Sequence, residues 1–306
     1  MEFKFEDLLE SIDIQNVSYE EFTDRLSILN ISDKSGNFEI KSNIKTFLNR
    51  VVKKPSDDRI IRLEQYQQNL YKMLVSDAHE SLKIWYDLYV GLKMSDDEYL
   101  KLPSGNCLNE KTFIGSTNSK YGKFSKNINF CDFYNTKKLY SNDSEYVFGL
   151  IKVMYERFHI RNSLVGPAFF DHICNMTSYK QIWTDFMIGA NKASIFNPYT
   201  YKSILDTLFE GDVLFAPVMG WNSYQQAFYN SNFKHFISTD VIPNVVENSH
   251  RIHDCYSDIF SFDTKKTIDV YLCPSEKLNE RYDFINKYKN TVDAVLFSRS
   301  EEHTSE

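Results

Sequence analysis

Residues 213–240 read VLFAPVMGWNSYQQAFYNSNFKHFISTD and decide the fold. Two short runs with strand character, Val213–Ala216 and His235–Thr239, enclose a glycine turn and a segment with helical character. This order predicts two parallel strands, because parallel neighbours need a crossover connection. Gly220 lies in the tight turn after the first strand, where the backbone can approach a ligand closely.

The same alternation extends to both sides of this stretch. Upstream, Asn197-Pro198 predicts a helix start, with asparagine as the N-cap and proline in the first turn, and we expect Gly211 to end that helix. Two further strands are predicted downstream, at Ile268–Cys273 and Ala294–Phe297. Helices are expected between the strands, at Ser223–Ser231, Asn244–His253 and Glu276–Lys289. The alternation predicts an α/β fold with a doubly wound, Rossmann-like parallel sheet.

The chain before this sheet is mostly helical by its pattern. Capping boxes begin at Ser18 and Ser95, where a serine hydroxyl and a glutamate three residues later satisfy the first N–H groups of a helix. Residues 103–130 are rich in Gly, Ser, Asn and Lys, which predicts a long loop. Further helices are expected at Ile61–Leu92, Ser144–Phe158, Pro167–Phe170 and Ile182–Ile188.

The expected organisation is a helix-rich region over residues 1–125, a helical segment over residues 126–193 and the sheet over residues 194–298. Residues 299–306 (RSEEHTSE) do not fit this pattern. The codon string AGA TCG GAA GAG CAC ACG TCT GAA, which resembles the start of a common sequencing adapter, would encode these eight residues. We therefore expect a non-native tail after an incomplete sheet.

Composition describes an ordinary globular protein, with 42% hydrophobic and 25% charged residues. The formal net charge of −7 weakens the case for a nucleic-acid partner without excluding a local basic cleft. The five cysteines are odd in number and contain no C-x-x-C pair, which favours reduced thiols over a disulfide framework. The N-terminus has no signal-peptide pattern and no window approaches the length of an apolar membrane span, so we expect no membrane partner and a cytoplasmic location.

Candidate ligand-binding residues lie after the first two strands. In doubly wound sheets, ligands bind outside the carboxyl ends of the strands. Pro217, Gly220 and Asn222 follow the first strand, and the second strand ends at Asp240, twenty positions after the glycine. A carboxylate at that place can accept both hydroxyls of a ribose, which predicts a nucleoside-containing ligand. The alternative role for Asp240 is the N-cap of the following helix.

The run from Val213 to Asp240 resembles the cofactor-binding half of class I S-adenosylmethionine-dependent methyltransferases. Within that family it is most similar to the phage amino-methyltransferases, in which a D-P-x-x-G-W/x-G turn follows the first strand. Ala216 replaces the usual acid of this motif, and Asn222 replaces its second glycine. The resemblance implies S-adenosylmethionine as the cofactor and, for a phage-encoded protein, the host cell cytoplasm as the location.

Two further segments match the family pattern. Phe196 and Pro198 correspond to an F-x-P segment that lines the methionine end of the cofactor. Ser275 and Glu276 follow the third strand, where the family contacts the adenine, and helix capping is their alternative role.

The resemblance also implies a catalytic residue at the end of the fourth strand. There the family has a small polar residue followed by Pro-Pro-Tyr. The side-chain oxygen of the polar residue and the carbonyl of the next proline accept the N–H groups of an exocyclic amine, while the aromatic ring stacks on the flipped base. Ser298 is the first residue of this motif, and Arg299 departs from it. The implied reaction is methyl transfer to cytosine N4 or adenine N6 of DNA, with RNA as an alternative substrate. We expect the chain itself to be inactive, because the motif stops after Ser298.

A non-catalytic module that binds a nucleotide or cofactor is the alternative from another functional class, because the fold can persist without the chemistry. Lys120, Lys123 and Lys126, interleaved with aromatic residues, resemble a strip that binds a nucleic-acid backbone, although a solvated loop explains them more simply.

Other enzyme classes and a metal site fit less well. A cysteine-based cytosine methyltransferase needs a cysteine after a proline on the fourth strand, whereas Cys273-Pro274 has the reverse order on the third. A nicotinamide-dependent dehydrogenase needs G-x-G-x-x-G, and this turn has one glycine. His250, His253 and Cys255 lack a fourth metal ligand nearby, which favours a surface role for them.

Overall fold

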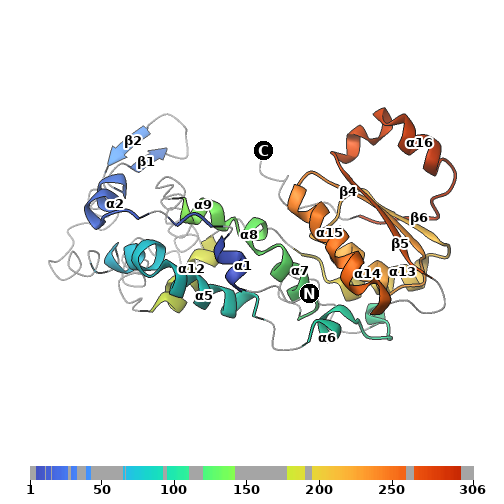
Figure 1. The fold of residues 1–306 in the computed structure, drawn as a ribbon, viewed down its shortest axis with the longest axis horizontal. Helices are drawn as coiled ribbons and strands as arrows, with labels where there is room; N and C mark the ends of the chain where they lie inside the picture. Colours follow the sequence, from blue (N-terminus) through green and yellow to red (C-terminus); the bar gives the residue numbers. More distant parts are fainter. Residues whose placement is uncertain are drawn as a thin grey trace. The chain divides into compact units, whose positions relative to one another are not determined.

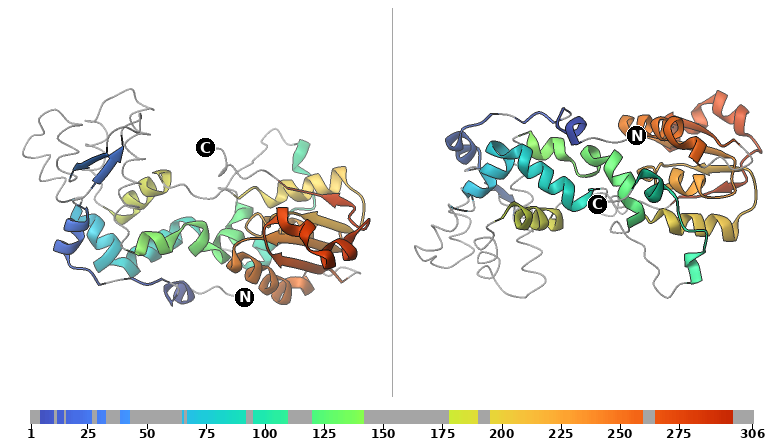
Figure 2. Two further views of the ribbon diagram at one scale, coloured as in Figure 1. Left: turned by 90° about the horizontal axis from the view of Figure 1, so that it is seen from above. Right: turned by 60° about the horizontal axis from the view of Figure 1, so that its bottom comes forward.

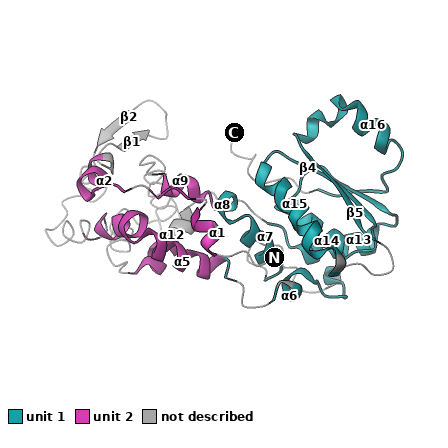
Figure 3. Ribbon diagram, in the orientation of Figure 1, with its two compact units in different colours: residues 1–3, 90–133, 193–306 teal, residues 4–89, 134–192 magenta. Residues whose placement is uncertain are grey.

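The computed structural model spans the chain, and our description is restricted to part of it. The described residues are 5–10, 12–14, 16–26, 29–32, 39–42, 65, 67–91, 95–109, 120–141, 178–189, 195–259 and 265–297. The chain divides into two compact units (Figure 3). Unit 1 contains residues 1–3, 90–133 and 193–306, and unit 2 contains residues 4–89 and 134–192. The helices predicted at Ser144–Phe158 and Pro167–Phe170, and the predicted tail, lie outside the described residues.

Unit 1 contains a four-stranded, all-parallel sheet with helices packed against it, so the chain has the incomplete Rossmann-like α/β fold that we predicted (Figures 1 and 2). The order across the sheet is β5-β4-β3-β6. The strands are β3 (Val213–Ala216), β4 (His235–Asp240), β5 (Thr267–Leu272) and β6 (Ala294–Val295). Strand order reverses between β3 and β6, and such a reversal is where doubly wound sheets bind ligands.

The helices between these strands are also those expected, with one difference. They are α14 (Ser223–Tyr229), α15 (Pro243–Tyr256) and α16 (Tyr282–Tyr288). The helix predicted at Glu276–Lys289 is divided, because a 3₁₀ segment, η5 (Ser275–Glu280), precedes α16 and Arg281 between them is extended, with φ −93° and ψ 96°.

The helix before the sheet, α13 (Pro198–Leu208), begins as predicted. The Asn197 side chain accepts a hydrogen bond from the Tyr199 backbone N–H at 3.0 Å, and proline occupies the first turn. The prediction for its end was wrong, because the C-cap is Phe209 in an extended conformation. Gly211 instead has φ 143° and lies where a Cβ would overlap the Asp293 side chain, so glycine is required for that close approach.

Alternate side chains of a strand point to opposite faces of a sheet, so each face has its own packing partners. Leu214 and Phe236 belong to the apolar core, together with Phe228 of α14 and Val245 and Ile252 of α15.

The opposite face carries α16. Phe284 of α16 contacts the rings of Phe215 and Tyr271, with centroids at 6.0 and 5.5 Å. A polar cluster holds the end of this helix to β5, since Lys287 and Tyr288 both donate to Asp269.

Residues 90–133 are part of unit 1, which the sequence pattern did not indicate. The capping box at Ser95 is confirmed, with Glu98 completing it. The predicted loop over residues 103–130 was wrong for its last part, because Phe124, Ile128 and Phe130 are buried there. The elements of this segment are α6 (Asp96–Leu100), η2 (Cys107–Asn109), η3 (Lys120–Gly122), α7 (Lys123–Ile128) and α8 (Phe130–Phe133).

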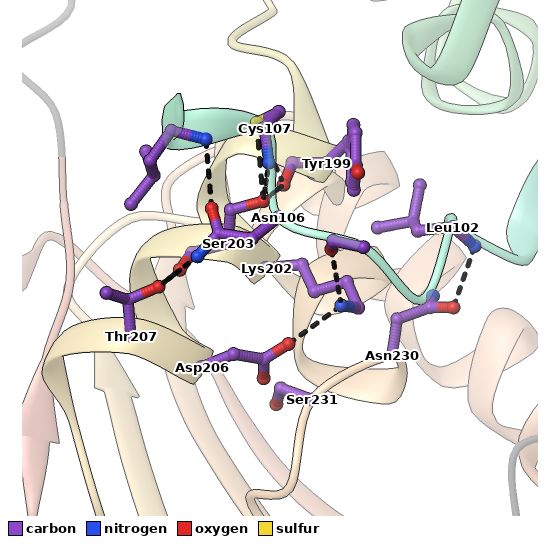
Figure 4. Close-up of polar contacts among 12 residues, drawn as sticks. Leu102, Asn106, Cys107, Tyr199, Lys202, Ser203, Asp206, Thr207, Asn230 and Ser231 are labelled. Carbon is purple, nitrogen blue, oxygen red and sulfur yellow. Dashed lines mark hydrogen bonds and ion pairs between the residues drawn. The ribbon is translucent and has the colours of Figure 1, made fainter. Parts of the chain in front are cut away.

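The segment over residues 102–107 is tied to α13 and α14 (Figure 4). The Cys107 backbone N–H donates to Ser203 Oγ at 3.1 Å, and the Leu102 backbone N–H donates to Asn230 Oδ1 at 2.8 Å. Lys202 is nearly buried, and its Nζ donates to the Gly105 carbonyl at 3.4 Å while forming an ion pair with Asp206 at 2.7 Å. These contacts hold a segment from far upstream against the helices of the sheet.

Unit 2 is mostly helical, and stacked indoles form part of its core. The rings of Trp85 and Trp183 stack with centroids at 4.2 Å, and Trp183 Nε1 donates to Ser81 Oγ at 2.8 Å. The helix predicted at Ile61–Leu92 contains a π-helical turn, η1 (Lys72–Ser76), and the antiparallel strands β1 and β2 were not predicted. The other elements of unit 2 are α1 (Phe5–Glu10), α2 (Tyr19–Leu26), β1 (Leu29–Ser32), β2 (Glu39–Ser42), α5 (Ala78–Tyr89), α9 (Thr136–Tyr140) and α12 (Tyr179–Gly189).

Among the described residues, we find no helix both long enough and apolar enough to cross a bilayer.

Candidate ligand site at the carboxyl edge of the sheet

The turn after β3 has an unusual backbone. Gly220, Trp221 and Asn222 are consecutive and all left-handed, with φ of 55°, 56° and 65°. A bulky residue such as tryptophan rarely adopts this conformation, and residues held in it concentrate at functional sites. A Cβ at Gly220 would overlap the Tyr224 ring, so the protein's own packing requires glycine there.

Asn222 and Pro217 contact the protein interior. The Asn222 side chain is buried, and its Nδ2 donates to the Val245 carbonyl of α15 at 3.2 Å. The Pro217 carbonyl accepts a hydrogen bond from Thr239 Oγ1 at 2.6 Å. Both residues were predicted to contact a ligand. In the structure the Asn222 amide bonds to α15 in the core, and the Pro217 carbonyl connects the turn to β4.

Asp240 joins the turn to the next strand. Its Oδ1 accepts the Ile242 backbone N–H at 2.9 Å, and the backbone N–H groups of Met219 and Val241 also donate to this carboxylate. Burial raises the pKa of Asp240 although these three hydrogen bonds favour the charged form. The alternative role was wrong, because Ile242 is the N-cap of α15 and no side chain caps that helix.

Large apolar side chains are exposed at the end of each strand of this edge. Single exposed apolar residues are common, but contiguous ones mark binding sites. One residue follows or ends each of β3, β4, β5 and β6. They are Val218, Val241, Leu272 and Phe297, with 39%, 62%, 53% and 63% of their surface exposed. We call these four residues the apolar rim.

The predicted F-x-P segment is connected to the turn through aromatic rings. Phe196 is half-buried, and its ring centroid lies 4.7 Å from that of Tyr201. Tyr201 in turn packs on Tyr224 at 4.1 Å, and their hydroxyls are 2.6 Å apart. Pro198 is buried in the first turn of α13. Sequence reasoning missed the two tyrosines, whose helical spacing is that of ordinary core residues.

Ser275 and Glu276 lie at the start of η5, after β5. Ser275 is half-buried and Glu276 is exposed, so both are near the edge. Pro274 is the N-cap of this segment and no side chain caps it, which argues against the capping role for these two residues. Ser298, the predicted catalytic residue, lies outside the described residues.

Two alternative sites are not formed. Lys126 is buried, with 5% of its surface exposed, so Lys120, Lys123 and Lys126 do not form one exposed strip. His253 Nδ1 contacts the Tyr229 hydroxyl at 2.7 Å, and no group of three or more metal-ligating side chains occurs among the described residues.

Comparison with protein-family models, curated proteins and solved structures gave no match for this chain. The carboxyl edge combines a half-buried carboxylate, a left-handed turn and an apolar rim, which is an arrangement suited to a ligand with both polar and flat apolar parts.

Proposed function

We propose that the carboxyl edge of the sheet binds S-adenosylmethionine, and that the chain is the cofactor-binding part of a methyltransferase acting on an exocyclic amine of a DNA base. One observation carries the proposal. Asp240 lies at the end of the strand next to β3, beside the turn that contains Gly220, and its carboxylate is partly desolvated.

The side chains at the edge fit the nucleoside part of this cofactor. A carboxylate removed from water gains most from hydroxyl donors, because hydrogen bonds to a charged acceptor compensate its desolvation. Asp240 has capacity beyond its backbone donors, since an ionised carboxylate offers about four acceptor positions. Val241, adjacent to it and 62% exposed, offers apolar surface for a purine ring.

The methyl-transfer step depends on the family resemblance. When bound, the cofactor supplies an electrophilic methyl group. We infer that Ser298, which follows β6, accepts a hydrogen bond from the target amine and holds it in line for attack. The strand order supports this placement, because β6 is a parallel neighbour of β3 and the carboxyl ends of both strands therefore lie at the same edge of the sheet.

Calorimetry with S-adenosylhomocysteine tests the binding site. We expect measurable affinity for the wild type and a loss of about tenfold or more for Asp240→Ala, because a hydrogen bond to a charged group contributes about 1.5–3 kcal/mol. Asp283→Ala is the matched control, since Asp283 is an exposed carboxylate on α16. Equal affinities of wild type and Asp240→Ala would remove Asp240 from the site.

A non-catalytic nucleotide-binding module is the second candidate, because Asp240 and the rim suit any ribonucleoside. Tighter binding of S-adenosylhomocysteine than of adenosine or ATP supports the methyltransferase, whereas equal or tighter binding of ATP supports the module. Incubation with tritiated S-adenosylmethionine and either DNA or RNA tests the reaction. Label on DNA would establish the reaction and overturn our expectation that the chain itself is inactive. Label on RNA alone would show that the substrate is RNA and not DNA.

A further inference from the structure

A layer of buried side-chain amides connects α7 and α8 to the left-handed turn. Asn129, between these two helices, donates from Nδ2 to Asn222 Oδ1 at 2.9 Å and to the Trp221 carbonyl at 3.3 Å. Asn129 is 2% exposed and Asn222 is 1% exposed. Two of the three left-handed residues are therefore held by one side chain that precedes them by more than 90 positions.

The orientation of the Asn129 amide is determined by its neighbours. Asn248 of α15 donates from Nδ2 to Asn129 Oδ1 at 3.1 Å and to the Ile128 carbonyl at 2.9 Å. The oxygen of Asn129 therefore accepts from α15, and its NH₂ group faces the turn. A rotated amide would bring its NH₂ group against the NH₂ group of Asn248 and lose both contacts to the turn.

The same segment also contacts the side chain of the turn. The Phe133 ring of α8 meets the Trp221 ring edge-on, with centroids at 5.4 Å and an interplanar angle of 86°. Asparagine tolerates φ near 60°, but a bulky tryptophan is strained there, and such strain persists only where the surroundings over-determine it. Asn129 and Phe133 hold the turn in this conformation, and both lie outside the sheet and its crossover helices.

We propose that Asn129 is a positioning residue of the ligand site, which holds residues 220–222 in the left-handed conformation that the bound ligand meets. The segment over residues 123–133 is then a structural part of the site. The inference rests on the proposed function for the identity of the ligand, whereas the hold on the turn does not depend on it.

Fluorine NMR of protein labelled with 5-fluorotryptophan tests the hold. The chain has three tryptophans, and Trp221→Phe assigns the signal of the turn. In Asn129→Asp, the new carboxylate faces the Trp221 carbonyl and Asn222 Oδ1 without a proton to donate. We expect the Trp221 signal to shift or split, while the Trp85 and Trp183 signals of unit 2 stay in place.

Asp132→Ala is the control, because Asp132 of α8 accepts a hydrogen bond from Asn244 of α15 at the surface, at 2.8 Å, and has no contact with the turn. Three unchanged signals in Asn129→Asp would overturn the inference. Where that variant does not fold, Asn129→Ala decides in the same way, since it removes the amide donor without burying a charge.

The ligand arm uses S-adenosylhomocysteine and the folded Asn129 variant. We expect its affinity to fall about tenfold, the effect of losing a positioned turn rather than a direct contact. A shifted Trp221 signal with unchanged affinity would overturn the positioning role. Absence of binding by the wild type would refute the proposed function and the positioning role together, and the NMR result would still decide whether Asn129 holds the turn.

Discussion

The two ends of the parallel sheet use charged side chains for opposite purposes. At the amino end, Asp293 Oδ2 accepts the backbone N–H groups of Asp212 and Val213, at 2.8 and 2.9 Å. These bonds lower the pKa of Asp293, as expected for an exposed carboxylate that gains donors. At the carboxyl end, Asp240 also accepts backbone N–H groups, yet burial raises its pKa.

A buried lysine completes the amino end. Lys266 is 7% exposed, and its Nζ donates to the carbonyls of Phe228, Ser231 and Phe233 at 3.1, 2.7 and 2.5 Å. The Phe228 carbonyl belongs to the last turn of α14, and the other two carbonyls follow that helix. The helix dipole favours a positive charge at this end of α14. The carboxyl end instead combines left-handed residues with exposed apolar side chains.

This difference indicates that the amino end stabilises the fold and that the carboxyl end is available for binding. At the amino end, the exposed Asp293 carboxylate lowers the free energy of the folded state, whereas the desolvated Asp240 carboxylate and the left-handed turn at the carboxyl end raise it. Unfavourable features of this kind persist at ligand sites, where they trade stability for function. Neutralising the carboxylates at the two ends should therefore change stability by different amounts.

The largest loss of stability is expected from Lys266→Met, which removes the Nζ donor of the Ser231 and Phe233 carbonyls, whereas the Phe228 carbonyl still accepts from Ser231. We expect the free energy of unfolding to fall by about 3 kcal/mol, because each unsatisfied buried polar group costs about 1–3 kcal/mol. Denaturant unfolding measures it. Lys265→Met is the control, since Lys265 is exposed and adjacent. Equal stability of the two variants would show that Lys266 does not support the amino end.

Gly220→Ala tests the carboxyl end with the next largest effect. Its Cβ would overlap the Tyr224 ring, and alanine is strained at φ 55°. We expect a loss of about 2 kcal/mol in the free energy of unfolding. Gly122→Ala is the matched control, because its Cβ would meet Ile195 at an ordinary 3.6 Å. A similar midpoint of thermal unfolding for both variants would contradict this reading of the turn.

The pH dependence of Lys266 follows from its burial, which lowers its pKa to about 8. Between this value and the unfolded pKa of about 10.4, the unfolded chain holds a proton that the folded protein has released, so stability rises with pH in that window. Below pH 8 both states are protonated and the cost of burying the charge is present in full. The stability difference between wild type and Lys266→Met should therefore increase with pH, by at most about 1.4 kcal/mol per pH unit.

Chemical denaturation of both proteins over pH 7 to 10.5 measures this difference. Taking the difference removes the titration of the other lysines and tyrosines. A difference that stays constant or decreases with pH would show that the Lys266 ammonium is not penalised by burial.

The smallest effect on stability is expected from Asp240→Asn. The amide oxygen can still accept the Ile242 N–H, and the loss of the second acceptor oxygen is offset by the removal of the desolvated charge, so we expect the free energy of unfolding at pH 7 to change by no more than about 0.5 kcal/mol. Affinity for S-adenosylhomocysteine should nevertheless fall. Asp293→Asn should lower stability, because its carboxylate favours the folded state. A loss of stability for Asp240→Asn comparable to that of Asp293→Asn would erase the contrast between the two ends.

The sheet could be predicted in detail because its signals are local. Val213–Ala216 matches β3, and the other predicted strands differ from the observed ones at their ends only. Segment 123–130 could not be predicted, since Phe124 and Ile128 are separated by polar residues and acquire their burial from distant helices. The strands β1 and β2 were missed because they are short and half polar.

The candidate site was predicted in part. The sequence places Asp240 at a strand end, and the structure adds its backbone donors and the raised pKa. Asn222 could not be placed from its position after Gly220, because the left-handed backbone directs its amide to α15. No local pattern identifies Asn129, whose role depends on hydrogen bonds to residues far along the chain.

The sequence by itself determined the alternation of strands and helices, and therefore the parallel sheet and the edge at which Gly220 and Asp240 meet. These features follow from the spacing of apolar residues and from turn residues, which act over a few positions. The tertiary structure alone decided the conformation of residues 220–222, the burial of the Asp240 carboxylate and the partners of Asn129 and Lys266. Strain, desolvation and buried hydrogen bonds depend on groups that are distant in sequence, so only the folded chain brings them together.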